Sequence, residues 1–120
     1  MEILRTNVDL NDKYKVYKLT KSSGTMVQDA PTGLSVPVES WMLYNDPKQG
    51  KDGTMKDNLV LSIVDTSGVK YSTISATFQR AFEDIVEMMG DTPFAVLFMQ
   101  GTTKNGKSFV TCELDCDYRG

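Results

Sequence analysis

QGTTKNGKS, from Gln100 to Ser108, decides the fold of this 120-residue chain, because it fits two patterns with opposite structural consequences. From Gly101 to Ser108 the letters match G-x-x-x-x-G-K-[ST], which holds nucleotide phosphates only between a strand and a following helix. The next segment, FVTCELDC from Phe109 to Cys116, instead alternates apolar and polar residues as a strand does, and only four residues follow it. The context therefore argues against a phosphate-binding loop, and nucleotide hydrolysis becomes the least favoured function.

The same letters predict a β-hairpin with a three-residue turn from Lys104 to Gly106, in which the glycine forms a bulge at positive φ. A two-residue turn would set Phe98 opposite Glu113 and mix apolar with acidic side chains. With the bulge, the opposed pairs are Phe98 with Cys112, Val96 with Leu114, and Phe94 with Cys116. We therefore expect one apolar face that carries both cysteines as buried thiols, too far apart to bond to each other.

Length and composition predict one domain, residues 1–120, with an N-terminal arm of about residues 1–12. No stretch is apolar enough to span a membrane and no secretion signal is visible, so a cytoplasmic location is expected. The chain has no histidine, the commonest metal ligand and general base. The sequence therefore argues against a hydrolytic enzyme, and neither a cofactor nor a metal is expected. Carboxylate-only metal sites stay open at Asp46, Asp52 and Asp57, or at Glu113, Asp115 and Asp117, although solvated surfaces explain these residues more simply.

Hydrophobic periodicity predicts three strands, one helix and the closing hairpin. The strands are Tyr14 to Lys21, Leu34 to Tyr44, and Leu59 to Asp65 with a continuation from Val69 to Tyr71. Pro37 indicates an edge or a bulge, and Asn45–Asn58, which has no periodicity, is expected to be a long mobile loop. The helix is expected from Thr73 to Met89, capped by Ser72 and ended by Gly90. This order predicts a mainly β fold, the OB-fold, a five-stranded Greek-key barrel with one α-helix between strands 3 and 4.

Three short segments carry a resemblance to a known family: APTG at Ala30–Gly33, YSTIS at Tyr71–Ser75 and QGTTKNGKSF at Gln100–Phe109. Together they make the chain resemble the single-stranded DNA-binding proteins of small tailed phages that replicate by protein priming, from about Lys15 to Leu114. The resemblance implies an OB-fold protein that coats and protects displaced strands during phage DNA replication, without sequence preference and without chemistry of its own. Its expected setting is the cytoplasm of the infected bacterium, with single-stranded DNA and phage replication proteins as partners. A monomer is expected, while an apolar strand side at Ala95, Leu97 and Met99 leaves self-association open.

Binding without sequence preference requires aromatic rings for the bases and cations for the phosphates. Tyr44 and Tyr71 each match a tyrosine of the family pattern and are the first stacking candidates. Trp41 and Phe109 are the next, because each lies on the polar side of its strand and is expected to be exposed. Tyr14 and Tyr17 would point to opposite faces of a strand, so at most one should reach the ligand. The candidate phosphate contacts are Lys18, Lys21, Lys48, Lys51, Lys56, Lys70, Lys104 and Lys107.

The overall charge argues against a nucleic-acid ligand, because 13 basic residues face 16 acidic ones and the formal net charge is −3. The acidic residues concentrate on the predicted helix and near the C-terminus, so a local positive groove can coexist with a negative whole. The alternative is an OB-type protein- or carbohydrate-binding module, in which Trp41, Tyr71 and Phe109 contact a peptide or sugar rings. Salt dependence separates the two, because DNA binding releases counterions and neutral sugar binding does not.

Overall fold

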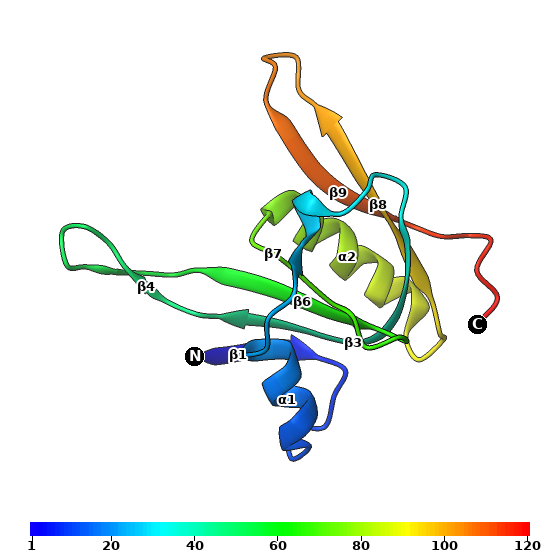
Figure 1. The fold of residues 1–120 in the computed structure, drawn as a ribbon, viewed down its shortest axis with the longest axis horizontal. Helices are drawn as coiled ribbons and strands as arrows, with labels where there is room; N and C mark the ends of the chain where they lie inside the picture. Colours follow the sequence, from blue (N-terminus) through cyan, green and yellow to red (C-terminus); the bar gives the residue numbers. More distant parts are fainter.

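The computed structural model describes residues 1–120, and a curled, mixed sheet runs through its centre (Figure 1). The strand order is β2 (Thr25–Met26), β7 (Lys70–Thr73), β6 (Leu59–Asp65), β3 (Ser35–Asn45), β8 (Ala95–Thr102) and β9 (Ser108–Leu114), with β1 (Glu2–Thr6) paired to β3. Strand β3 joins the two halves, because its first residues pair with β8 and its later ones with β6. The path ends at β2 and β9, so the sheet is open. The OB-fold barrel expected from the sequence is therefore not confirmed.

Helix α2 (Ala76–Met89) packs on one face of this sheet and forms the larger core. Phe78 and Phe82 are fully buried there, among side chains of β3, β6 and β8. The helix starts three residues later than expected, because β7 continues to Thr73, which pairs with Leu61. Ser75 rather than Ser72 is the N-cap, and its side chain accepts a hydrogen bond from the Phe78 backbone N–H at 3.2 Å. The end at Gly90 is as predicted.

The segment Lys13–Thr20 is a helix, α1, so the strand predicted from Tyr14 to Lys21 is wrong. The Asp12 side chain caps the helix by accepting a hydrogen bond from the Lys15 backbone N–H at 3.2 Å. Eight residues are too few to separate a helical period from a strand alternation by pattern alone, and β-branched and aromatic residues favoured the strand. The first twelve residues, predicted to be an arm, contain β1.

Helix α1 covers the face of the sheet opposite to α2. Leu19 is fully buried in a second, smaller core with Met42, Tyr44 and Val64, and Val16 packs against its edge. Each helix thus covers one face of the β3–β6 pair. Neither helix is long and apolar enough to cross a membrane.

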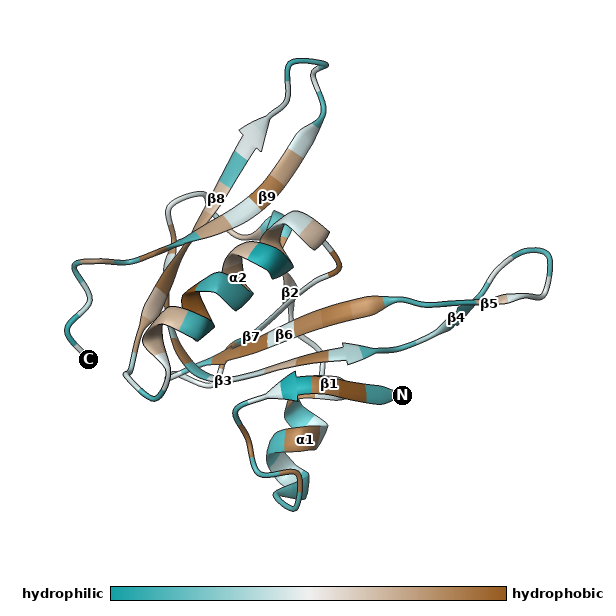
Figure 2. Cartoon of the chain, turned by 180° about the vertical axis from the view of Figure 1, so that it is seen from behind, coloured by the Kyte–Doolittle hydropathy of each residue, from teal (hydrophilic) through white to brown (hydrophobic).

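The segment Asn45–Asn58 is an ordered hairpin rather than the loop that we expected. Strands β4 (Lys48–Gln49) and β5 (Met55–Lys56) pair with each other, and at the base the Asp46 N–H donates to the Asn58 carbonyl at 2.9 Å. Both faces of this hairpin lie in solvent, so it needs no apolar alternation, which explains the missing periodicity. In Figure 2 the outer ends of both long hairpins have hydrophilic colours, whereas β6 in the body of the sheet is hydrophobic.

The closing hairpin of β8 and β9 has the predicted register. Phe98 pairs with Cys112 and Val96 with Leu114, while Gly106 has a φ of 81° and ends a three-residue turn. The third predicted pair, Phe94 with Cys116, is wrong, because β8 begins at Ala95 and β9 ends at Leu114. Cys116 is consequently exposed rather than buried.

A bulge between Val38 and Ser40 changes which side chains of β3 face the α2 core. The bulge that Pro37 indicated is therefore present, but its effect on the alternation was missed. Beyond the bulge Trp41 and Leu43 join Val36 in the larger core, and Met42 and Tyr44 face α1. An extra residue shifts the alternation by one, which turns Trp41 from the expected solvent side to the inside.

Candidate nucleic-acid interface

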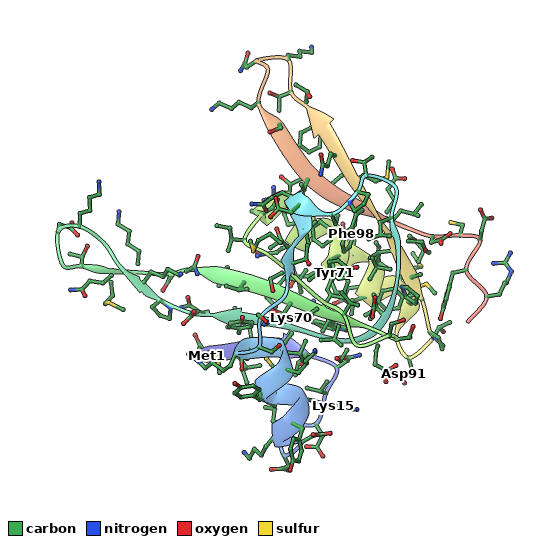
Figure 3. All side chains as sticks on the ribbon, in the orientation of Figure 1. Met1, Lys15, Lys70, Tyr71, Asp91 and Phe98 are labelled. Carbon is green, nitrogen blue, oxygen red and sulfur yellow. The ribbon has the colours of Figure 1, made fainter.

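The two long hairpins extend from the body of the molecule (Figure 1). Their outer parts carry exposed lysines (Figure 3). The β4–β5 hairpin carries three of them and the β8–β9 turn carries two. The β4–β5 hairpin continues the central strands β3 and β6, while β8 and β9 end the sheet on one side, and the two hairpins point in different directions (Figure 1). A single strand that contacts both must therefore cross the body between them. The lysines are Lys48, Lys51 and Lys56 on the first hairpin, and Lys104 and Lys107 on the second.

The β4–β5 hairpin carries charges of both signs, and two like charges face each other across its strands. Lys48 and Lys56 are direct cross-strand partners, and like charges in that position repel each other. Three aspartates, Asp46, Asp52 and Asp57, share the hairpin and balance its formal charge. Hydrogen bonds from the Thr54 hydroxyl and N–H lower the pKa of Asp52. Neither of the carboxylate sets left open by the sequence is gathered into a group of three side chains that could hold a metal ion.

Phe109 offers an exposed aromatic ring at the start of β9. Its side chain is 36% exposed and lies over Gly101, its cross-strand partner, where an added Cβ would be only 2.5 Å from the Phe109 Cζ. Glycine therefore lets the ring lie close against β8. The ring borders a hollow of about 430 Å³, whose other lining residues are Gln28, Ser75, Gln100, Ser108 and Val110. This ring agrees with the sequence expectation that Phe109 is exposed.

Tyr71 and Lys70 lie on β7, in the body of the sheet, and both side chains make contacts within the fold. The Tyr71 ring packs edge-on to Phe98, with 5.1 Å between the ring centroids, and burial followed by the charge of Asp65 raises its pKa. Lys70 is buried, its Nζ donates to the Ser22 carbonyl at 2.7 Å, and burial followed by the charge of Lys18 lowers its pKa. Lys70 therefore links β7 to the segment that follows α1, and its ammonium group is not available to contact a phosphate.

Trp41 and Tyr44 are each only 5% exposed, so neither ring has a free face for a base. The exposure expected for Trp41 is wrong, because the bulge in β3 turns it inward. Its ring packs edge-on against Phe82, and the Arg5 guanidinium lies 5.8 Å from its centroid. The Tyr44 hydroxyl is 3.5 Å from the Ser62 hydroxyl under α1.

A larger hollow, of about 620 Å³, lies away from both hairpins, between β1 and the end of α2. Arg5 lines it together with Glu87, and the two form an ion pair at 2.9 Å. Since its arginine is already paired and its tryptophan is buried, this hollow lacks the free cations and rings that a nucleic acid requires.

Helix α1 places Tyr14 and Tyr17 on the same face, whereas the predicted strand would have separated them. Tyr14 and Tyr17 are 90% and 63% exposed, the largest values for any aromatic residue of the chain. One helical turn puts them on one face, whereas a strand would have put them on opposite faces. Lys18 and Lys21, two predicted phosphate contacts, follow each tyrosine by four residues. One feature of the sequence does indicate this surface: the segment from Lys13 to Lys21 carries several lysines and no carboxylate.

The two cysteines should differ sharply in reactivity. Burial, followed by the charge of Glu113, raises the pKa of Cys112 to about 12, while Cys116 is exposed. Because the thiolate is the reactive form, we expect a disulfide reagent such as dithiobis(nitrobenzoate) to modify one thiol of the folded protein rapidly and the second only after denaturation. A Cys116→Ser variant should lose the rapid phase. Two rapid thiols per chain would contradict the burial of Cys112.

An open β-sheet with two lysine-bearing hairpins and an exposed ring fits the class of small proteins that bind single-stranded nucleic acids. Residues 4–115 match the family described as "Phage Single-stranded DNA-binding protein". The chain belongs to this family, which confirms the resemblance drawn from its three short segments.

Two curated relatives are similar to the chain over most of its length. The single-stranded DNA-binding protein of Bacillus phage phi29 is 26% identical over 110 residues, which cover 88% of this chain and 86% of the relative. The protein of the same name from Bacillus phage PZA has the same identity and coverage. No solved structure matches the chain.

Proposed function

We propose that this protein binds single-stranded DNA without sequence preference and coats displaced strands during phage DNA replication, in the cytoplasm of the infected host. The observation that carries this proposal is the family match over residues 4–115. We propose no catalytic step and no cofactor. The exposed lysines and the ring of Phe109 supply the two kinds of contact that binding of this type requires.

We also propose that the fold is an open variant of the OB-fold. Five strands, β3, β6, β7, β8 and β9, follow one another in OB order, with α2 between the third and the fourth. In OB-folds the ligand contacts the face of strands 2 and 3 and the loops that follow strands 1 and 4. These correspond here to β6 with β7, to the β4–β5 hairpin and to the β8–β9 turn.

This correspondence gives the hairpin lysines a role. The loops that flank an OB ligand site are the two segments where this chain carries Lys48, Lys51, Lys56, Lys104 and Lys107. A net charge of −3 does not prevent binding, because the potential at a surface depends on the local charges more than on the total. The β8–β9 turn carries Lys104 and Lys107 without a carboxylate, whereas the lysines of the β4–β5 hairpin stand among three aspartates. The acidic residues of α2 lie on the other side of the β3–β6 pair from α1, with Glu83 and Glu87 held by Arg5.

The test is a titration of a fluorescein-labelled mixed-sequence single strand and of its duplex at several salt concentrations. We expect the single strand to bind more tightly than the duplex, with an affinity that falls as salt rises by a log–log slope of about 0.7 for each phosphate neutralised. A second single strand of different sequence should bind with similar affinity. Absence of binding at low salt would overturn the proposal and favour a protein- or carbohydrate-binding module.

A further inference from the structure

Helix α1 lies where an OB-type protein would present its sheet to the ligand. The outer face of β6 is covered by the small core of Leu19, Met42, Tyr44 and Val64, which α1 completes. The buried Lys70 closes the adjoining part of β7 by its bond to the segment that follows α1. If the proposed function holds, a strand of DNA that crosses this face meets the outside of α1 rather than the sheet.

The outside of α1 carries the groups that a single strand requires. At 100° per residue, the inward Val16 and Leu19 lie opposite to a face formed by Tyr14, Tyr17, Lys18 and Lys21. Tyrosines exposed to 90% and 63% contribute almost nothing to the core, so their rings are available to a ligand. They are spaced by one turn, and a lysine follows each of them one turn later.

The charge on this helix is complementary to DNA although the chain is acidic. Lys13–Lys21 contains four lysines and no carboxylate, so with a total of −3 the rest of the chain carries −7. The two nearest preceding carboxylates are turned to the backbone, where Asp12 accepts from the Lys15 N–H and Asp9 from the Asn11 N–H. Repulsion between Lys18 and Lys70 contributes to the lowered pKa of Lys70, so positive charge is concentrated where α1 meets the sheet.

We propose that the outward face of α1 is a further contact surface for single-stranded DNA, on which Tyr14 and Tyr17 stack with bases while Lys18 and Lys21 contact phosphates. This inference rests on the proposed function and enlarges the site beyond the two hairpins. Stacking is tolerant of sequence because every base has a π-face. The surface therefore adds affinity and length to the site without adding specificity.

The test compares the wild-type protein with two double variants in the titration described above. Tyr14→Ser with Tyr17→Ser should weaken binding to a mixed-sequence single strand by about tenfold or more, because one stacked base alone is worth roughly 5- to 150-fold. Tyr14→Phe with Tyr17→Phe keeps the ring faces and should bind within about twofold of the wild type. Thermal melts followed by circular dichroism should be the same for all three proteins, since neither ring is buried.

A second measurement uses the wild-type protein only and so does not depend on the folding of a variant. A single strand that contains 5-iodouracil, irradiated in the complex, should crosslink to the peptide that contains Lys13–Lys21.

Phe109→Ala serves as the reference for the hairpin site. The α1 surface is refuted if the Tyr14→Ser, Tyr17→Ser variant binds as the wild type does, or if the crosslinks omit this peptide. The proposed function still stands in that case, provided that the wild type binds and Phe109→Ala weakens binding. If the wild type does not bind, both fail.

Discussion

A variant with alanine at Lys48, Lys51, Lys56, Lys104 and Lys107 is expected to lose most of its affinity for single-stranded DNA. Each lysine that neutralises a phosphate contributes a log–log salt slope of about 0.7, which corresponds to roughly fivefold in affinity at 0.1 M salt relative to 1 M. Five such contacts amount to at most about three thousandfold, and to a slope lower by about 3.5. The measurement is the titration of a labelled single strand by wild type and variant between low and moderate salt.

A loss of positive charge elsewhere on the molecule provides the control, with two charges removed instead of five. Arg80 and Arg119 are exposed and lie on α2 and near the C-terminus, outside both hairpins. An Arg80→Ala, Arg119→Ala variant should bind with nearly the wild-type slope, since only charges close to the strand release counterions. If each lost charge lowered the slope equally wherever it lay, the DNA would be following the average charge and not a defined site. An unchanged slope in the five-lysine variant would place the site away from the hairpins.

The sequence predicted those parts of the fold whose signals are local. The β8–β9 register followed from turn chemistry at Gly106 and from alternation on both sides of it. Strand β6 has the predicted bounds, Leu59–Asp65, because its two faces are buried in two cores and its flanks are polar. By contrast, α1 could not be predicted from its own residues. Its helical state depends on the packing of Leu19 against the sheet, which is a tertiary contact. The start of α2 depended on how far β7 stays paired, because both Ser72 and Ser75 can cap a helix.

For the candidate site residues, exposure could be predicted from the sequence more readily for the cations than for the rings. Lysines are almost always exposed, so the hairpin lysines could be identified from composition alone. Whether an aromatic ring is buried depends on one residue of register, and the bulge in β3 reversed the answer for Trp41. Tyr14 and Tyr17 would lie on opposite faces of the predicted strand but lie on one face of the helix. An error in secondary structure therefore concealed the most exposed rings of the molecule.

Phe82→Ala is expected to lower the free energy of unfolding by about 3 to 5 kcal/mol, the largest stability loss from any single change considered. The ring is fully buried on α2 and touches three other aromatic residues, with centroid distances of 5.6 Å to Trp41, 6.5 Å to Phe78 and 6.1 Å to Phe94. Truncation removes apolar burial and leaves a cavity that these rigid rings cannot fill. Urea unfolding followed by far-ultraviolet circular dichroism measures the change without relying on Trp41 emission, which the substitution alters directly.

Met88→Ala is the matched control, because Met88 is on the same helix but 81% exposed. It should change the free energy of unfolding by less than about 0.5 kcal/mol, as alanine and methionine are both good helix formers. The contrast isolates the packing of α2 on β3, β6 and β8, and this packing holds the sheet from which both lysine hairpins extend. A typical domain has only about 5 to 15 kcal/mol of stability, so Phe82→Ala should also lower DNA binding wherever the unfolded fraction becomes appreciable. A loss below about 1 kcal/mol would mean that α2 contributes little to the core and that the hairpins are held by strand pairing alone.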